Sequence, residues 1–458
     1  MSQYNEWQDR ARALEAAESV RFRADHPASE ALWQASRKNY PGGVPLHWML
    51  DWATPFPLFI ATARGATIID MDGHRYADFC LGDSGALFGH APPAIARAIA
   101  EQAERGLTAM LPGSDTAAVG PMLAQLFDLP FWQTAATASD ANRAVIRWAR
   151  ALTDRDTLLL FEGCYHGQVD ETFVEVHEGA VRARPSLVGP LAGATDKTLL
   201  VPFNDLSAVE AALAGGKVAL ILAEPALTNT GMVLPQPGFL EALLALGQRN
   251  GALVAFDETH TIATARGGYA VANGLSPDFL VVGKPIAGGL PAAVYGFTAA
   301  IEAGMARLQA ERPSGYSGIG TTLSGNLLTM AAMRACLAEV MSEAAYRHMT
   351  EAATRLAERL GHEIAARRLP WSVIRLGARV ELVFSPRPPR NGAEARAALD
   401  DDLERALHLY LLNRGIILTP FHNMMLVSPA TSPADIDRLC TLMAQAFDIL
   451  IGRAEPSA

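Results

Sequence analysis

One of the four lysines in this chain stands where an amine could do chemistry. Lys284 ends the apolar run of residues 279–283 and precedes a glycine-rich loop at residues 285–289. A low-dielectric setting disfavours the charged ammonium and leaves the neutral amine that a nucleophile needs. The alternative is a lysine that extends from a strand end into solvent. The other three lysines lie in polar or turn-like segments, where we expect them to be solvated: Lys38, Lys197 and Lys217.

A carboxylate occupies a comparable position one unit earlier. Asp257 follows the apolar run of residues 252–256, so we expect it where a buried strand ends. An unpaired carboxylate there is costly, so it needs a helix cap, an arginine or a cationic ligand. A protonated pyridine nitrogen is such a ligand. An aspartate and a lysine at successive strand ends are what pyridoxal 5′-phosphate (PLP) needs, since the lysine holds the cofactor as a Schiff base and the aspartate keeps the ring nitrogen protonated.

PLP also needs a phosphate site and a stacking group. Residues 134–142 are rich in small and hydroxyl side chains and precede a helical pattern, and a helix N-terminus favours an anion. Ordinary N-capping by Thr137, Ser139 or Asp140 explains the same pattern. Tyr165, in the segment Cys-Tyr-His-Gly, is available to stack on a ring, or is an ordinary loop aromatic.

The elements that must position these residues alternate along the chain. Strands are expected where apolar runs occur: residues 157–161, 199–202, 218–223, 252–256 and 279–282. Helical patterns separate several of them: residues 142–152, 206–213 and 239–249. This alternation predicts an α/β protein with a parallel sheet covered on both faces. Ligands bind beyond the carboxyl ends of such strands, where four polar side chains are expected: Glu224, Asp257, Glu258 and Lys284.

The sequence predicts two domains. Residues 91–327 contain the alternating pattern and form the expected PLP-binding domain. A long helical pattern over residues 328–367 and an amphipathic one over residues 432–453 follow. We expect residues 328–458 to form a smaller domain that residues 1–90 join.

Composition excludes several classes of function. The net charge is −10 and no basic run is present, which argues against nucleic acid as a partner. The four cysteines lie far apart without CxxC spacing, so neither a metal site nor a disulfide framework is expected. No signal peptide or membrane-spanning stretch is evident, which predicts a cytoplasmic protein with no membrane partner.

The order of several motifs resembles a known family. They are PGGV at residues 41–44, CYHG at 164–167, EPALTNTG at 224–231, FDETHT at 256–261, PDFLVVGKPIAGGLP at 277–291 and GTTLSGN at 320–326. Together they resemble the class III, fold-type I PLP-dependent aminotransferases, in the group near glutamate-1-semialdehyde aminomutase and β-amino-acid transaminases. The resemblance covers residues 41–437 and implies a large, mostly parallel-sheet domain with a smaller α+β domain.

The resemblance implies roles for individual residues. Lys284 and Asp257 are the implied catalytic pair, and Lys284 also shuttles the proton. The implied cofactor-binding residues are Thr137, Ala138, Ser139, Tyr165, His166, Glu224, Asp257, Thr259, Lys284 and Thr322. Among them Thr322 reaches the phosphate of the neighbouring subunit, which implies a homodimer with shared active sites. Three positions depart from the family pattern: Ala138 replaces a glycine, Thr259 a valine, and His260 the usual Met or Gln.

The substrate positions depart further. Both arginines that hold a substrate carboxylate in the family are missing, at residues 45–50 and 420–426. The candidate substrate-binding residues there are Trp48, Phe88, Phe421 and His422, which with Trp52 and Met424 would suit an apolar amine. The alternative is that these aromatics pack in the core. For the carboxylate of a keto acid, the candidate cations are His422, Arg414 and Arg266, with His422 ranked first.

The expected activity follows from these departures. We expect a PLP-dependent aminotransferase that moves an amino group from an amine to a keto acid such as pyruvate. The alternatives are a glutamate-1-semialdehyde-type aminomutase, a racemase or a β-amino-acid transaminase. A PLP-fold protein that binds without turnover is a third possibility, against which the intact Lys284 and Asp257 argue.

Overall fold

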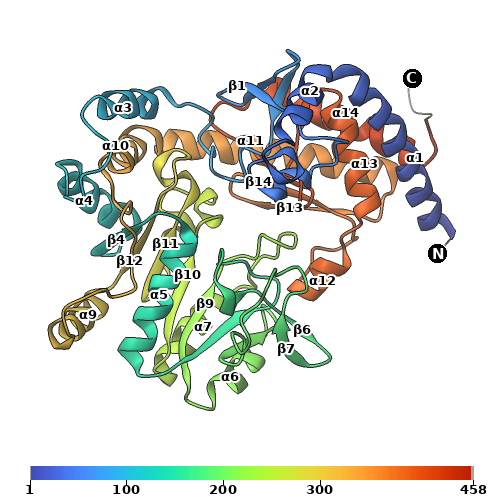
Figure 1. The fold of residues 1–458 in the computed structure, drawn as a ribbon. Helices are drawn as coiled ribbons and strands as arrows, with labels where there is room; N and C mark the ends of the chain where they lie inside the picture. The colour runs from blue at the N-terminus through green and yellow to red at the C-terminus, as the bar shows by residue number, and fades with distance from the viewer. Residues whose placement is uncertain (1, 455–458) are drawn as a thin grey trace. The chain divides into compact units, whose positions relative to one another are not determined.

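The computed structural model describes residues 2–454, which form two compact units (Figure 1). The large unit comprises residues 93–346 and 389–397, and the small unit comprises residues 2–92, 347–388 and 398–454. The expected C-terminal boundary lay after residue 327, whereas the observed one lies after Tyr346. The helical segment before Tyr346 contacts other elements of the large unit, and Tyr346 Oη donates to Ile262 O at 3.1 Å.

A seven-stranded sheet forms the centre of the large unit. Its strands, in spatial order, are β4 (Phe131–Ala135), β12 (Ala293–Phe297), β11 (Phe279–Val282), β10 (Leu253–Asp257), β9 (Val218–Ala223), β5 (Thr157–Phe161) and β8 (Thr198–Val201). All pairs are parallel except the two that β12 makes. Strands β5, β9 and β11 are buried along their whole length, as continuous apolar runs in a parallel sheet predict.

Helices complete the large unit, and several of them contact strands of the sheet (Figure 1). They are α3 (Pro93–Ala103), α4 (Asp115–Phe127), α5 (Ala138–Thr153), α6 (Leu206–Leu213), α7 (Phe239–Asn250), α8 (Gly268–Ala272), α9 (Ala299–Glu311), α10 (Leu327–Ala335) and α12 (Gly392–Ala397). A small hairpin pairs β6 (Val174–His177) with β7 (Ala180–Ala183). Helix α5 contacts the central strands β9 to β12 through a buried stripe that includes Ala141, Ala144, Val145 and Trp148, which is amphipathic helical spacing.

The small unit contains two sheets and the two ends of the chain. One sheet has the order β1 (Ile60–Arg64), β2 (Thr67–Asp70), β3 (Arg75–Asp78) and β15 (Ile416–Ile417). The other has β13 (Ser372–Leu376), β14 (Arg379–Val383) and β16 (Met424–Leu426). The helices are α1 (Ser2–Asp25), α2 (Pro27–Ser36), α13 (Asp401–Leu412) and α14 (Pro433–Leu450), with α11 (Glu343–Arg367) beginning four residues before the unit boundary.

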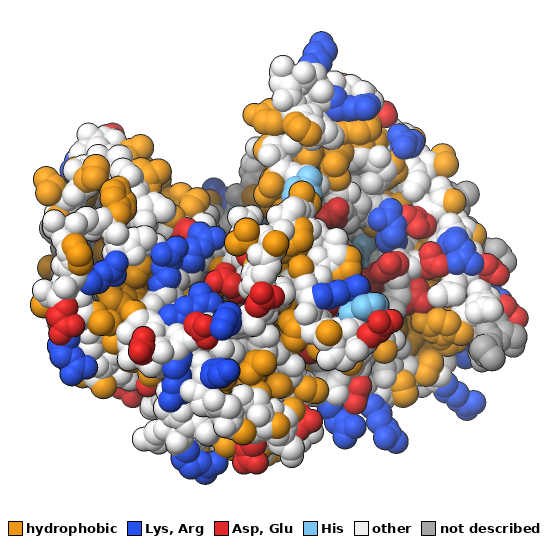
Figure 2. All heavy atoms as spheres, turned by 60° about the horizontal axis from the view of Figure 1, so that its bottom comes forward, with side chains coloured by type: hydrophobic (Ala, Val, Ile, Leu, Met, Phe, Trp, Pro, Cys, Tyr) orange, Lys and Arg blue, Asp and Glu red, His pale blue; other side chains and the backbone are white. Residues whose placement is uncertain are grey.

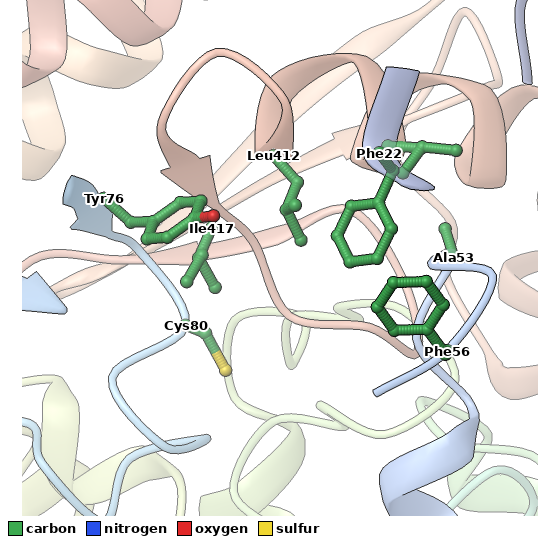
Figure 3. Close-up of a cluster of buried hydrophobic side chains, with 8 residues drawn as sticks. Phe22, Ala53, Phe56, Tyr76, Cys80, Leu412 and Ile417 are labelled. Carbon is green, nitrogen blue, oxygen red and sulfur yellow. The ribbon is translucent and has the colours of Figure 1, made fainter. Parts of the chain in front are cut away.

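One hydrophobic cluster joins the N-terminal and C-terminal segments of the small unit (Figure 3). Phe22 of α1 and Tyr76 of β3 pack with Leu412 of α13 and Ile417 of β15. Because this core needs both segments, residues from the two ends of the sequence form one unit.

A buried polar network lies beside that cluster. His26 Nδ1 lies 2.7 Å from Phe22 O, and Tyr76 Oη is 2.8 Å from His26 Nε2 and donates to Asp70 Oδ2 at 2.7 Å. Ligand-type atoms of His26, Asp70 and His74 lie within 4.8 Å of one another, a grouping that the sequence analysis did not anticipate. Each of these three atoms has a hydrogen-bond partner, so the network accounts for the grouping without an ion.

The expected helix over residues 328–367 is interrupted. Helix α10 ends in a π-helical turn, Cys336–Val340, and Met341 leaves the helical region with ψ of 59°. Ser342 then starts α11 by accepting the Ala345 N–H at 3.2 Å. The break is a local side-chain cap that helical periodicity does not reveal.

Charged side chains of both signs are interspersed over the face shown in Figure 2. Of the helices within residues 2–454, none combines the length and apolar composition that crossing a bilayer requires.

Candidate active site

Three polar side chains follow neighbouring strands of the large unit. Glu224 follows β9, Asp257 ends β10, and Lys284 follows β11 after one glycine. Strand β10 lies between β9 and β11 and is parallel to both, so the carboxyl ends of the three strands meet at one edge of the sheet. This edge is where open α/β sheets bind ligands.

The N-terminus of α5 approaches the same edge closely. A Cβ atom built on Gly283 would lie 2.9 Å from the Ala138 Cβ and 3.5 Å from Thr259 Oγ1. Only a glycine allows this separation without a shift of the helix. The close approach therefore brings the first turn of α5 against the strand end that carries Lys284.

Asp257 is buried and accepts three hydrogen bonds. Its Oδ2 lies 3.0 Å from His166 Nδ1 and 2.7 Å from Asn142 Nδ2, and its Oδ1 accepts the Thr259 N–H at 3.1 Å. Burial by itself raises the pKa of the Asp257 carboxyl, but these donors, His166 foremost, outweigh burial and lower the pKa. Burial likewise opposes a charged His166, yet Cys164 and Asp257 raise the pKa of His166 to about 10. The two shifts agree on an ionised carboxylate beside an imidazolium.

Lys284 has an unusual backbone conformation. Its φ is 48°, in the left-handed region that non-glycine residues rarely adopt. Such backbone strain concentrates at functional sites. Lys284 Nζ lies 2.5 Å from His260 Nε2, so an imidazole faces the amine.

The loop after β5 contacts both α5 and β9. Ser139 Oγ accepts the Gln168 N–H at 2.9 Å, and Gly167 has φ of 77° and lies against Ser139. Glu224 Oε1 accepts the Tyr165 N–H at 3.0 Å. Thr137 caps α5 by accepting the Asp140 N–H. The structure therefore brings these sequence-predicted residues to one region, with Lys284 and Asp257.

Thr322 belongs to the same unit, in the segment between α9 and α10. It lines a cavity of about 600 Å³ together with Met110, Tyr316, Thr321 and Asn326. Tyr316 and Met110 are 95% and 78% exposed, so two large, exposed side chains lie at this cavity.

The predicted substrate residues all belong to the small unit. The Trp48 and Phe421 rings lie 6.4 Å apart in an edge-on contact, and Phe88 is buried. His422 is buried, with Nδ1 2.8 Å from Glu381 Oε1. Burial disfavours a charged His422, but Glu381 raises its pKa. His422 Nδ1 therefore already has a carboxyl partner within its own unit.

An apolar cavity of about 450 Å³ also lies in the small unit. Its lining includes Trp48 and Trp52, as expected, together with Met49, Leu58 and Ile417. Phe88, Phe421 and Met424, which we expected in the same pocket, are not among its lining residues.

Sequence reasoning missed Asn142 and Thr228 and gave His260 no role. Asn142 is a buried polar residue within an apolar helical stripe, which is a signal that the sequence carried. Thr228 has no such signal, because hydroxyls are common in loops.

The family model for "Aminotransferase class-III" matches residues 49–447. The chain belongs to this family. It is therefore a PLP-dependent enzyme of fold type I, as the resemblance implied.

Several proteins of this kind are similar over nearly their whole length. A solved glutamate-1-semialdehyde aminomutase from Pseudomonas aeruginosa PAO1 is 47% identical with a TM-score of 0.94, covering 96% of this chain and 99% of that one. A variant of it has been solved in complex with PMP. The β-phenylalanine aminotransferase from Variovorax paradoxus is 28% identical with a TM-score of 0.86, covering 98% and 100%. A glutamate-1-semialdehyde 2,1-aminomutase from Sorangium cellulosum is 35% identical over 93% of this chain and 97% of its own length.

The residues at the strand ends fit PLP. Oδ1 of Asp257 accepts one hydrogen bond where Oδ2 accepts two, so it retains capacity for the N–H of a protonated pyridine. Within residues 2–454, Thr259 Oγ1 and His166 Nε2 are buried without a hydrogen-bond partner. Unpaired buried polar atoms are typical of a site that a polar ligand completes.

Proposed function

We propose that Lys284 binds PLP as a Schiff base and that Asp257 pairs with the ring nitrogen. When bound, the cofactor draws electrons from the substrate carbon that bears nitrogen. The ionised state of Asp257 beside His166 supports this pairing with the ring nitrogen. A carboxylate that stays charged at neutral pH favours the protonated form of a pyridine nitrogen beside it. Lys284 Nζ would then take a proton from the substrate carbon that bears nitrogen and return it to the cofactor carbon bonded to the same nitrogen.

The remaining contacts are proposed from the same arrangement. Thr137, Ala138 and Ser139 would hold the phosphate at the N-terminus of α5, where backbone N–H groups and the helix dipole favour an anion. Tyr165 and Thr259 would flank the ring. His166 supports Asp257, and Glu224 fixes the backbone of Tyr165.

For the reaction itself, the aminomutase alternative has better support than the amine–pyruvate reaction that we expected. The observation that carries it is the 47% identity, over nearly both whole chains, to the Pseudomonas glutamate-1-semialdehyde aminomutase. The first candidate activity is therefore exchange of an amino group between adjacent carbons of a glutamate-1-semialdehyde-like substrate.

An amine transaminase remains the second candidate. The two segments that carry substrate arginines in the family have none here, at residues 45–50 and 420–426. The small unit also contains the apolar cavity beside Trp48 and Trp52. Burying hydrocarbon there would favour an amine by roughly 25 cal/mol per Å².

The test compares three substrates on the purified enzyme. Specificity constants, kcat/KM, are measured for glutamate 1-semialdehyde alone, and for a β-amino acid and 1-phenylethylamine with pyruvate. A clear preference for the semialdehyde supports the aminomutase. A clear preference for 1-phenylethylamine rejects the aminomutase in favour of the amine transaminase. A clear preference for the β-amino acid rejects both in favour of a β-amino-acid transaminase.

The assembly is proposed as a homodimer in which Thr322 reaches the phosphate bound by the partner subunit. The exposed Tyr316 and Met110 beside Thr322 support this, because a dimer would cover them. The cytoplasm stays the predicted location.

A further inference from the structure

A chain of hydrogen bonds leads from Lys284 to a buried carboxylate. His260 Nε2 lies 2.5 Å from Lys284 Nζ, and His260 Nδ1 lies 2.6 Å from Thr228 Oγ1. Thr228 Oγ1 in turn donates to Glu224 Oε2 at 2.7 Å. Glu224, Thr228 and His260 are all buried, so water does not replace these contacts.

When Glu224 is ionised, counting protons fixes which group donates in each of these hydrogen bonds. Thr228 has one hydroxyl proton, and it goes to the ionised Glu224. The Thr228 oxygen must then accept the Nδ1–H of His260. That tautomer leaves a lone pair on His260 Nε2, which faces the amine of Lys284.

A protonated Glu224 reverses every bond. The carboxyl donates to Thr228 Oγ1, the hydroxyl donates to His260 Nδ1, and His260 Nε2–H donates to the neutral amine of Lys284. Passing from this state to the first moves three protons in one direction, so the carboxyl loses a proton and the amine becomes an ammonium. Burial raises the pKa of Glu224, which favours this protonated state of the carboxyl.

We propose that Glu224, Thr228 and His260 are a proton relay that sets the protonation state of the Lys284 amine. The proposal rests on the proposed function only in assigning the reactive amine to Lys284. The other charged groups that face Glu224 are His166 and Asp257, which are paired with each other. His260 and Thr228 are positioning residues here, because they act through Lys284.

The relay makes a specific prediction for Glu224→Gln. A glutamine keeps the Tyr165 N–H bond through Oε1 but donates to Thr228 through Nε2, as the protonated carboxyl does. His260 Nε2–H would then point at Lys284 and favour the neutral amine. Thr228 and His260 separate Glu224 from Lys284, so the relay transmits a change at Glu224 through three hydrogen bonds, which a purely structural contact would not do.

The test measures the amine directly in the full chain freed of cofactor. Limiting acetic anhydride labels the lysines at one pH, and peptide mass spectrometry gives the labelling of Lys284 relative to Lys197. Loss of a charge-assisted acceptor should make Lys284 in Glu224→Gln and Thr228→Val roughly tenfold more reactive. Thr228→Ser, which keeps the hydroxyl, should match the parent, and circular dichroism checks the fold.

Two outcomes would overturn the relay. One is unchanged Lys284 labelling in folded Glu224→Gln, and the other is equal labelling in the serine and valine variants of Thr228. If Thr228→Val is too unstable to purify, His260→Leu removes the acceptor and carries the same expectation. Because no cofactor is present, a failed relay is distinguishable from a cofactor attached elsewhere than Lys284.

Discussion

His166 Nδ1 lies 3.0 Å from Oδ2 of Asp257, and both side chains are buried. The pair holds the carboxylate ionised and oriented at the end of β10, and Asn142 holds the same oxygen from α5. An aspartate so placed can supply a fixed negative charge to a cationic ring without rearrangement.

Replacing Asp257 tests that charge. We expect Asp257→Asn to keep the fold and bind PLP, but to lower the single-turnover rate of the first half-reaction by roughly two or more orders of magnitude, since the ring nitrogen loses its counter-ion. Rapid-mixing absorbance measures this rate. The matched control is Asp205→Asn, a helix cap of α6 where asparagine caps equally well. A near-normal rate in Asp257→Asn would reject the electrostatic role.

The close approach of Gly283 and Ala138 predicts a compensating pair. Gly283→Ala places a Cβ 2.9 Å from the Ala138 Cβ, and overpacking of this kind costs about 1–3 kcal/mol. We expect the strand end and the first turn of α5 to move apart, with PLP affinity falling about tenfold or more. Ala138→Gly in the same chain should restore affinity, measured by fluorescence titration. If the double variant binds PLP as weakly as Gly283→Ala, the contact does not position the site.

Shared active sites predict complementation between inactive variants. In a hybrid of Lys284→Ala and Thr322→Asp chains, one site collects both lesions and the other is intact. Random exchange should therefore restore up to roughly a quarter of the parental activity, because half the dimers are hybrids with one working site. Lys284 and Asp257 of one chain serve the same site, so each site of a hybrid between Lys284→Ala and Asp257→Ala chains keeps one lesion. Mixing these two variants should therefore restore no activity. Shared active sites would be contradicted if hybrids of Lys284→Ala and Thr322→Asp chains are inactive. They would also be contradicted if the protein sediments as a fully active monomer.

Glu404 predicts how stability depends on pH. Burial raises the pKa of this small-unit carboxyl to about 8, above its unfolded value, so its contribution to stability is full below about pH 4 and is lost as pH rises through 8. We expect Glu404→Gln to remove that loss and to be more stable than the parent at pH 8.5, by on the order of a few kcal/mol. Urea unfolding at pH 5.5 and 8.5 measures it, with the exposed Glu101→Gln as control. Parallel pH profiles for parent and Glu404→Gln would reject the assignment.

The sequence predicted most of what positions the site. The expected strands over residues 157–161, 218–223 and 279–282 match β5, β9 and β11, because buried parallel strands are short apolar runs between turns. The strand-end positions of Asp257 and Lys284 followed directly from them. Strands β4 and β12 were not predicted, since Phe131–Ala135 mixes polar and apolar residues and Ala293–Phe297 follows the glycine-rich loop closely.

Side-chain partners were harder to predict. The contact of His166 with Asp257 depends on the conformation of a loop, and so does the link that Thr228 makes between Glu224 and His260. Hydrophobic periodicity in the sequence does not predict loop conformation. The same holds for the break at Met341, which a local cap produces. The substrate was inferred from two arginines that are missing, and a missing residue is compatible with several substrates.

Borohydride reduction tests the central claim most directly. It fixes a Schiff base between PLP and a lysine, and peptide mapping of the parent protein then locates the modified residue among the four lysines. We predict that the label is found on the peptide containing Lys284 and that Lys284→Ala carries none. Label on Lys38, Lys197 or Lys217, or an equally labelled Lys284→Ala, would contradict the account.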